Sequence, residues 1–150
     1  MKRIAIYARV SGNTQKNDLE RQISSLEDYV KKHFPQAEYM VVKDIASGLK
    51  EDRRGLRRLI EMARKRQIDA VLVAYKDRLT RFGFTYLREL FEAYGVKVIV
   101  VLHEKPKDYY QELVEDLIAI VTSFAGRIYG KRSRKYKRVV EAVEQAVKDP

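Results

Sequence analysis

The sequence predicts an open α/β domain, in which a mostly parallel sheet is flanked by helices. Short apolar runs rich in β-branched and aromatic residues alternate with segments whose apolar residues recur at helical spacing. The runs are apolar almost throughout, which is typical of parallel strands covered on both faces. Strands that alternate with helices in this way are joined by right-handed crossovers. The length of 150 residues suits one ordinary domain.

Four strands and three helices are predicted in the first two thirds of the chain. The strands are RIAIYAR at 3–9, EYMVVKDI at 38–45, DAVLVAY at 69–75 and VKVIVVLHE at 96–104. The helices are expected over 19–34, 55–67 and 84–94, and Gly95 is a suitable residue to end the last of them. Together these elements predict an α/β core over residues 1–107.

The last third has no strand signal and predicts one long helix from Tyr109 to Val147. Its apolar residues form one stripe: Leu113, Leu117, Ile120, Val121, Phe124 and Ile128. A helix of this length extends beyond a domain of this size, so residues 108–150 are expected to pack on another subunit or on a ligand. Gly126 and Gly130 lie on one face of this helix, where they predict either a close helix–helix approach or a bend.

The charge of the chain predicts an anionic partner. The formal net charge is +10, which favours nucleic acid first and an acidic membrane second. The segment RIYGKRSRKYKR holds seven basic residues and no acidic one. This run is either a solvated helix face or a surface that follows the phosphates of DNA. The residues expected to contact DNA are Arg127, Lys131, Arg132, Arg134, Lys135 and Arg138.

Several classes of protein are excluded by what the sequence lacks. No segment approaches the ~18 consecutive apolar residues of a membrane span. The N-terminal apolar run is short and interrupted by Arg9, unlike a secretion signal. The chain has no cysteine, which excludes disulfides and thiolate chemistry and is compatible with the cytosol. No glycine-rich phosphate loop is present, so we expect no nucleotide or other small-molecule substrate.

Polar residues follow three of the predicted strands, at the edge where open α/β sheets bind their ligands. They are Arg9 and Ser11 after the first strand, Ser47 and Arg53 or Arg54 after the second, and Asp77, Arg78 and Arg81 after the third. Gln15 and Gln22 can reach the same edge from the following loop and helix. Arg9 is costly to bury within a strand unless an anionic group lies beside it.

A hydroxyl among guanidinium groups suits attack on a phosphodiester. Arginine is a poor base but clamps phosphate with two hydrogen bonds, and attack by Ser11 would leave a covalent phosphoserine. The alternatives are structural. Ser11 can cap the next helix, as can Asn13 or Thr14, while Ser47 can belong to a simple turn and Asp77 can form a surface ion pair with Arg78.

The set of motifs resembles the catalytic domain of serine recombinases. It consists of YARVS with Gln15, then Leu19 and Gln22, then SG with a following arginine, then DRLTR. DRLTRFG and GRIYGKRSRK are most similar to the serine transposases of insertion sequences. The resemblance implies a flavodoxin-like fold with a long helix that dimerises and crosses double-stranded DNA. It implies attack by serine on each strand, leaving a 5′-phosphoserine and a free 3′-hydroxyl. Subunit rotation in a tetramer and religation then follow, without metal or cofactor.

The same resemblance implies a role for each residue at the strand ends. Ser11 is the nucleophile. Arg9, Arg78 and Arg81 bind and activate the phosphate; Ser47 and Arg53 form a second cluster; Gln22 supports the site; and Asp77 is the candidate proton donor to the leaving oxygen. Arg53 is preferred to its neighbour Arg54 because its spacing from Ser47 fits better.

Two departures from the family pattern qualify the expected function. Family members carry a separate DNA-binding domain, whereas Met1 lies beside the first strand and Pro150 ends the chain. We therefore expect an isolated catalytic domain, active in the prokaryotic cytoplasm at the nucleoid. Near AGRIYG the acidic and basic residues of the family do not align. Two competing functions are a nuclease that holds Mg²⁺ on Asp44 and Asp77, and a DNA-binding or assembly module without catalysis.

Overall fold

The computed structural model describes residues 1–102 and 109–148. The chain divides into two compact units, Met1–Lys105 and Pro106–Pro150. The boundary that the sequence predicts, between residues 107 and 108, lies outside the described residues, as do residues 103 and 104 of the predicted fourth strand.

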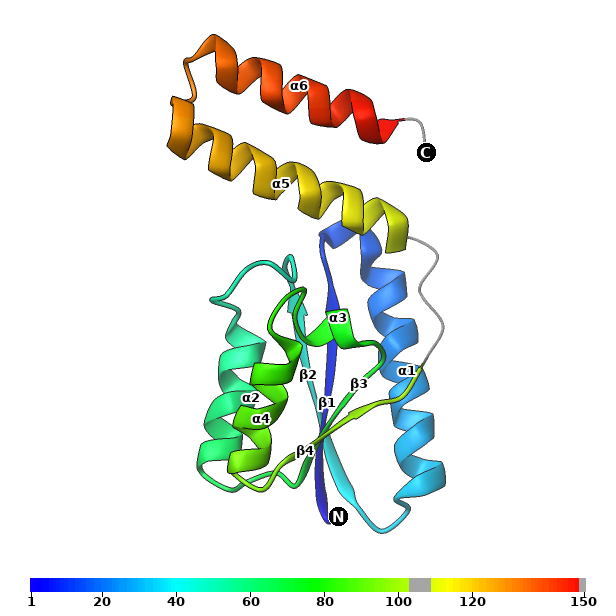
Figure 1. The fold of residues 1–150 in the computed structure, drawn as a ribbon. Helices are drawn as coiled ribbons and strands as arrows, with labels where there is room; N and C mark the ends of the chain where they lie inside the picture. Colours follow the sequence, from blue (N-terminus) through cyan, green and yellow to red (C-terminus); the bar gives the residue numbers. More distant parts are fainter. Residues whose placement is uncertain (103–108, 149–150) are drawn as a thin grey trace. The chain divides into compact units, whose positions relative to one another are not determined.

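The first unit is built on a four-stranded parallel sheet (Figure 1). The strands are β1 (Arg3–Val10), β2 (Glu38–Ile45), β3 (Ala70–Val73) and β4 (Lys97–Val100), in the order β2-β1-β3-β4. The predicted parallel α/β sheet is confirmed. β1 pairs with β2 along its whole length and with β3 on its other side, so it is buried from Ile4 to Val10.

Helices cover both faces of this sheet, with α1 on one side and α2 and α4 on the other (Figure 1). Their bounds are α1 (Lys16–His33), α2 (Arg54–Arg64) and α4 (Phe84–Ala93), which confirms the three predicted helices. Two short elements were not predicted: a 3₁₀ turn, η1 (Asn13–Gln15), and one helical turn, α3 (Lys76–Leu79). Both follow the carboxyl ends of strands and shape the loops there.

Alternate residues of the strands fill two cores, because successive side chains of a strand point to opposite faces. One core contains Ile4, Ile6, Leu26, Val30, Ala70 and Leu72. The other includes Tyr7, Val71, Val73, Leu59, Leu79 and Phe91. Burying one Leu or Phe side chain of this kind stabilises the fold by about 1.5–3 kcal/mol. The two cores hold the sheet rigid beneath its carboxyl edge.

The second unit consists of two helices, α5 (Tyr109–Tyr129) and α6 (Arg134–Lys148). The prediction of one unbroken helix from Tyr109 to Val147 is wrong. Gly130 adopts a left-handed conformation with φ of 82°, and its amide donates to the carbonyl of Gly126 at 2.9 Å, which ends α5. The Ser133 hydroxyl then accepts from the amide of Lys135 at 3.1 Å, at the start of α6.

The two helices lie side by side (Figure 1). A Cβ atom at Gly126 would lie 3.6 Å from Cγ of Lys131 and 3.8 Å from a ring carbon of Tyr136, which is ordinary van der Waals contact. Of the two glycines that the sequence singled out, Gly130 thus provides the bend, whereas the packing at Gly126 does not require a glycine. None of the helices among the described residues is long and apolar enough to cross a membrane.

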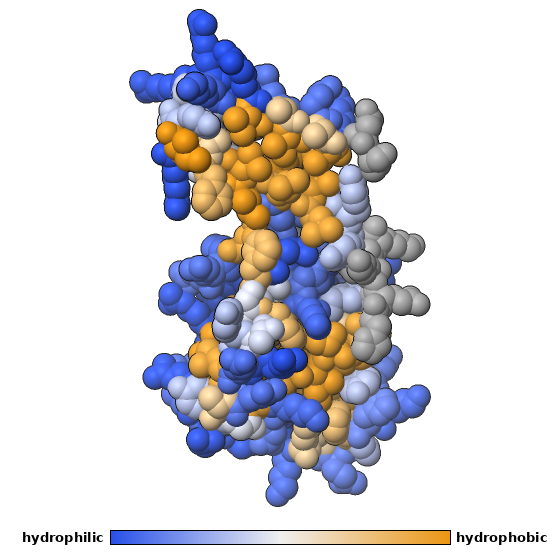
Figure 2. Space-filling view, in the orientation of Figure 1, coloured by the Kyte–Doolittle hydropathy of each residue, from blue (hydrophilic) through white to orange (hydrophobic). Residues whose placement is uncertain are grey.

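One face of α5 exposes a row of large apolar side chains, part of the apolar area of this unit in Figure 2. The exposed residues are Tyr110, Leu113, Leu117, Phe124 and Ile128, and Phe124 is 60% exposed. Four of them belong to the stripe that the sequence predicted. Exposed apolar rows of this kind mark surfaces that bind other molecules.

Candidate active site

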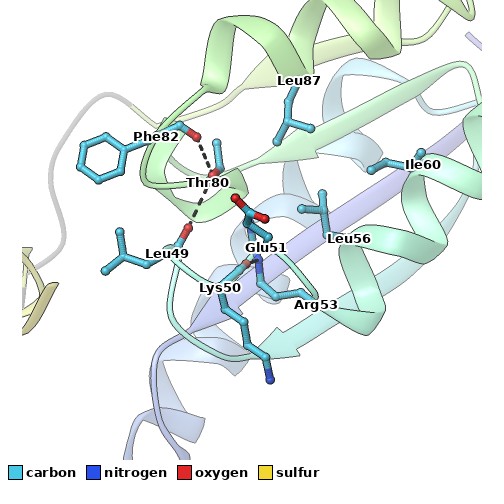
Figure 3. Close-up of a pocket in the computed structure, with 10 residues that line it drawn as sticks. Leu49, Lys50, Glu51, Arg53, Leu56, Ile60, Thr80, Phe82 and Leu87 are labelled. Atoms are coloured by element: carbon cyan, nitrogen blue, oxygen red, sulfur yellow. Dashed lines mark hydrogen bonds between the residues drawn. The ribbon is translucent and has the colours of Figure 1, made fainter. Parts of the chain in front are cut away.

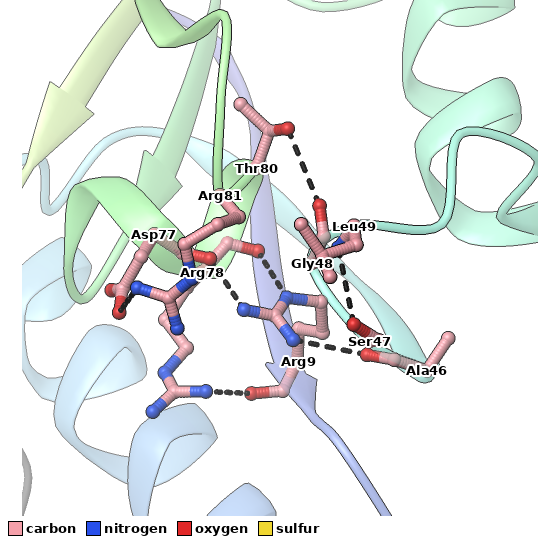
Figure 4. A network of polar contacts seen from close by, with 9 residues as sticks. All are labelled: Arg9, Ala46, Ser47, Gly48, Leu49, Asp77, Arg78, Thr80 and Arg81. Atoms are coloured by element: carbon pink, nitrogen blue, oxygen red, sulfur yellow. Dashed lines mark hydrogen bonds and ion pairs between the residues drawn. The ribbon is translucent and has the colours of Figure 1, made fainter. Parts of the chain in front are cut away.

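The carboxyl edge of the sheet brings together the residues that the sequence placed at the strand ends. Ser11 follows β1, Ser47 follows β2, and the segment Asp77–Arg81 forms α3 and the loop beyond it, after β3. Because β1 lies between β2 and β3, its end is flanked by both other loops. Figure 4 shows the contacts between these loops, with Arg9 at their centre.

Arg9 is fully buried and its guanidinium joins the loops that follow β2 and β3. Its Nε donates to the carbonyl of Arg78 at 3.0 Å, Nη1 donates to the carbonyl of Ala46 at 3.0 Å, and Nη2 donates to the carbonyl of Asp77. The sequence suggested that a buried arginine here needs an anionic neighbour. The structure shows that carbonyl dipoles surround the charge, so Arg9 holds the loops of the site together.

The loop after β2 fits against Arg9 only because residue 48 is glycine. A Cβ atom on Gly48 would lie 2.9 Å from Nη2 of Arg9 and 3.2 Å from the amide of Arg81. The carbonyl of Gly48 accepts a hydrogen bond from that same amide at 3.1 Å. The SG motif therefore has a steric reason: the backbone passes directly against two of the site's arginines.

Ser11 does not cap a helix. The residues at the N-terminal boundaries of η1 and α1 are Gly12 and Gln15, and neither boundary carries a side-chain cap. Oε1 of Gln15 instead accepts from the amides of Ser11 and Gly12, both at 3.1 Å, and so fixes the backbone that carries the serine. Ser11 is therefore not the N-cap residue of η1 or α1, and it lies partly buried directly after β1.

Gln22 and Arg78 both bind the backbone of Arg9. Oε1 of Gln22 accepts from the amide of Arg9 at 3.3 Å, and Nε2 of Gln22 donates to its carbonyl at 2.9 Å. Nη1 of Arg78 donates to the same carbonyl at 3.3 Å. The side chain of Arg78, like that of Arg9, is buried at this edge of the sheet.

Asp77 and Arg81 form an ion pair one helical turn apart. Oδ2 of Asp77 lies 3.1 Å from Nη1 of Arg81, and the two side chains are only 13% and 8% exposed. A charge pair shielded from solvent to this degree is screened less than a surface pair. The carboxylate therefore orients the guanidinium of Arg81 at the edge of the sheet.

Arg53 lies inside the protein, whereas Arg54 is exposed at the start of α2. Nε of Arg53 donates to the carbonyl of Lys50 at 2.9 Å (Figure 3). Nη2 of Arg53 donates to the carbonyl of Leu79 at 2.6 Å. In the same loop, the hydroxyl oxygen of Ser47 accepts a hydrogen bond from the amide of Leu49 at 3.1 Å. Arg53 thus connects the loop after β2 to the end of α3.

Tyr7 and Asp44 belong to this network; Tyr7 was not predicted as a site residue, and Asp44 was considered only as a metal ligand of the competing nuclease. The Tyr7 hydroxyl donates to Oδ2 of Asp44 at 2.6 Å and accepts from Nη1 of Arg53 at 2.9 Å. Burial raises the pKa of the Tyr7 hydroxyl above its ordinary value, against the opposing charge of Arg53, and the hydrogen bond to Asp44 adds to the increase. A tyrosine within a buried strand needs a partner for its hydroxyl, and that was the available signal.

The carboxylate of Asp44 is occupied by protein donors. Besides Tyr7, it accepts the amides of Gly55 at 2.9 Å and Leu56 at 3.0 Å, at the start of α2. Asp77 is paired with Arg81. Among the described residues no group of three or more His, Asp or Glu side chains could hold a metal ion. Both carboxylates that the competing nuclease would use for Mg²⁺ thus have partners within the protein.

The basic residues expected to contact DNA surround the turn between α5 and α6 and lie on two helices instead of one. Arg127 lies near the end of α5, Lys131 and Arg132 lie in the turn, and Arg134, Lys135 and Arg138 lie on α6. All six are exposed. Lys135 also places its ammonium 5.8 Å from the centre of the Tyr129 ring.

Comparison with known proteins assigns the family. Residues 4–146 match the family described as "Resolvase, N terminal domain". The chain belongs to this family of serine recombinases. The resemblance seen in the motifs is therefore confirmed, and with it the expected fold class.

Solved structures place the chain near the serine recombinases of insertion sequences. The C-terminal catalytic domain of ISC1926 TnpA, an IS607-like serine recombinase, is 53% identical, with a TM-score of 0.91 over 98% of this chain and 99% of that one. A serine recombinase from Sulfolobus solfataricus is 43% identical, with a TM-score of 0.82 over 99% of this chain and 100% of that one.

The curated relatives are longer than this chain. A putative resolvase of Acanthamoeba polyphaga mimivirus is 42% identical over 131 residues, which are 87% of this chain and 65% of that protein. The recombinase domain seen here thus spans slightly less than two thirds of that relative's length.

Proposed function

We propose that this chain is a catalytic domain that cuts and rejoins double-stranded DNA through a covalent phosphoserine. The observation that carries the proposal is the placement of Ser11. It ends the central strand, it caps no helix, and its backbone is held by Gln15 beside the loops that Arg9 joins. The sequence motifs and the family of the chain support the same conclusion.

In the proposed reaction the Ser11 hydroxyl oxygen attacks the scissile phosphorus. The bond from phosphorus to the 3′ oxygen breaks, the serine proton passes to a base, and the 3′ oxygen takes up a proton. The products are a 5′-phosphoserine ester and a 3′-hydroxyl. Rejoining is the reverse reaction, in which a 3′-hydroxyl attacks the phosphoserine. The ester preserves the energy of the broken bond, so the reaction needs neither a metal nor a cofactor.

The other residues are assigned by their contacts. Arg78 and Arg81 bind the non-bridging oxygens of the phosphate, where charge grows in the transition state. Arg9 adds a permanent positive charge and holds the loops in register. Asp77, an ion-paired carboxylate, is proposed to take up the proton that leaves Ser11 and to donate it to the 3′ oxygen. Ser47, Arg53 and Gln22 maintain the loops around the nucleophile.

The proposed assembly is a homodimer that forms a tetramer when two DNA sites are brought together. Cutting both strands requires one Ser11 for each strand, and the exposed apolar row on α5, which includes Leu117 and Phe124, offers a surface for a second copy. The basic residues around the α5–α6 turn are proposed to contact the DNA backbone. A domain with this activity acts where the DNA is, in the prokaryotic cytoplasm.

The test is a search for a covalent protein–DNA adduct. The protein, together with any DNA-binding domain that accompanies it in the full-length form, is incubated with element-end DNA and separated under denaturing conditions. We expect an adduct that survives chelator and is lost in Ser11→Ala. Cleavage without adduct that stops in chelator would instead indicate a nuclease. DNA association without any cleavage would indicate a binding module.

A further inference from the structure

We propose that a polar cavity beside the carboxyl end of β2 binds a second phosphate of the DNA strand, next to the phosphate that Ser11 attacks. The cavity has a volume of about 460 Å³ and is lined by the end of β2 and the start of α2. Its charged lining includes Lys50, Asp52, Arg54 and Arg57. The inference rests on the proposed function, because it assigns a further subsite to the same DNA strand.

Side chains, rather than backbone amides, provide the charge in this cavity. The amides of Gly55 and Leu56 at the start of α2 already donate to Asp44, and Arg53 donates inward. Among the described residues, no carboxylate forms an ion pair with Lys50 or Arg54. These two cations are exposed and available for a ligand.

Arg57 is a third cation that a phosphate can recruit. Its Nε lies 2.7 Å from Oδ1 of Asp52, but the two side chains are 72% and 68% exposed. An ion pair in contact with water to this degree is weak. A phosphate that enters the cavity can therefore replace the carboxylate of Asp52 as the partner of Arg57. The negative charge of Asp52 then opposes the binding of DNA at this position.

The cavity and the arginines Arg78 and Arg81 follow strands on opposite sides of β1, although the loop after β2 also meets Arg81 at Gly48. These arginines follow β3, Ser11 follows β1, and the cavity lies at the end of β2. Ile45 pairs with Val10, so the floor of the cavity is one strand away from the serine, or about 4.8 Å between neighbouring strands. Cations on both sides of the nucleophile suit a strand that carries one phosphate per nucleotide, about 3.4 Å apart along the helix axis.

A neighbouring cavity of about 310 Å³ gives a contrast (Figure 3). Its walls include the apolar side chains of Leu56, Ile60 and Leu87. Lys50 and Arg53 line both cavities, and the neighbouring cavity adds the carboxylate of Glu51. The cavity at β2 instead adds the cations Arg54 and Arg57, and these two residues separate the chemistry of the two linings.

The test uses charge-neutral variants with matched controls on α2. Arg54→Gln and Lys50→Gln are compared with Arg64→Gln, which lies at the far end of the helix beside Glu61. Binding to a duplex of random sequence is measured over a range of salt concentrations. Each cavity variant should flatten the slope of log K against log salt by about 0.9, whereas Arg64→Gln should leave it unchanged.

A variant that gains affinity makes the test sharper. Asp52→Asn should release Arg57 and steepen the slope by about one unit, since one more cation meets phosphate. Glu61→Gln, which breaks the equivalent pair with Arg64, should have no effect. Phenylglyoxal modification of the arginines, measured by mass spectrometry, should decrease at Arg54 and Arg57 when DNA is bound. Modification of Arg64 should be equal with and without DNA.

The outcomes distinguish this inference from the proposed function. If the cavity variants keep the wild-type slope and Asp52→Asn gains nothing, the second subsite is wrong, even while wild type forms its adduct. If the slopes change as expected but no adduct forms, the cavity binds DNA and the proposed cleavage fails. Wild type that neither binds duplex nor forms an adduct would overturn both. Unchanged thermal unfolding of the variants excludes loss of the fold as the cause.

Discussion

Tyr7→Phe is the sharpest test of the buried network beneath the site. The change removes one oxygen atom and keeps the ring that packs in the core. It deprives Oδ2 of Asp44 of its hydrogen bond at 2.6 Å and Nη1 of Arg53 of its acceptor at 2.9 Å. Each partner keeps two other hydrogen bonds, so neither group is left entirely unsatisfied.

The expected magnitude follows from these two weakened groups. A buried polar group that loses its partner costs about 1–3 kcal/mol, and because both groups keep other partners the lower end applies to each, about 2 kcal/mol in all. For a chain of this length that lowers the midpoint of thermal unfolding by roughly 6 °C. Arg53 also binds the carbonyl of Leu79, so a shift of its side chain moves the loop that carries Arg81. We therefore expect adduct formation to slow by at least about tenfold.

Tyr39→Phe is the matched control. The Tyr39 hydroxyl donates to Oε2 of Glu27 at 2.7 Å, but this contact is only partly buried and lies away from the active-site edge. Its loss should cost less than about 1 kcal/mol and leave adduct formation unchanged. Calorimetry and a time course of the adduct measure both effects. Equal unfolding temperatures for the two variants would refute the argument that the Tyr7 network supports the site.

The Tyr7 network also predicts a dependence on alkaline pH. The pKa of Tyr7 is raised in the folded protein above its ordinary value near 10. The folded state thus holds the proton where the unfolded state has released it, and the stability from this group is complete below pH 10 and falls as pH rises further. The unfolding free energy of wild type should decline above pH 10 more steeply than that of Tyr7→Phe. Parallel curves would contradict the cause assigned to the shift.

Four further substitutions test the remaining assignments. Ser11→Ala should abolish the adduct while changing stability by less than about 1 kcal/mol, since no helix cap is lost. Gross unfolding of this variant would instead indicate that Ser11 has a structural role. Arg9→Lys should lower stability by about 2–4 kcal/mol, because one ammonium cannot replace three directed donors to buried carbonyls. Arg81→Lys should mainly slow adduct formation and change stability little. If Arg81→Lys mainly lowered stability and Arg9→Lys mainly slowed adduct formation, these roles would be contradicted. Phe124→Glu should yield monomers in sedimentation without lowering the unfolding temperature, whereas unchanged association would exclude the α5 row as the dimer surface.

The sheet and its three long helices could be predicted because their signals are local and periodic. β1 reads as a near-continuous apolar run because both of its faces are covered, and α1 repeats Leu19, Leu26 and Val30 on its buried side. The broken C-terminal helix was harder to predict. Gly130 is compatible with a weakened helix or with a left-handed turn, and the choice depends on the packing of α6 beside Gly126. That contact lies outside any local pattern.

The site was predicted by residue type and by its place at the strand ends, but the direction of each side chain was not. The sequence shows that Arg9 lies near the end of a buried strand, but it does not show that the guanidinium donates to three backbone carbonyls. For the same reason the sequence did not distinguish Tyr7 from other aromatic residues of the core, although its hydroxyl joins Asp44 to Arg53. Hydrogen-bond partners 37 and 46 residues away leave no trace in local periodicity.

The inward direction of Arg9 has a consequence for catalysis. The loops that carry Ala46 and Asp77 are bonded to one guanidinium, on the strand that ends at Ser11. Their relative positions are therefore set before DNA arrives. Electrostatic stabilisation is strongest when the charges that meet the transition state need not be rearranged during the reaction. A phosphate bound at this edge would meet Arg78 and Arg81 on loops already in place, and a lysine at position 9 would leave those loops to be ordered by the DNA itself.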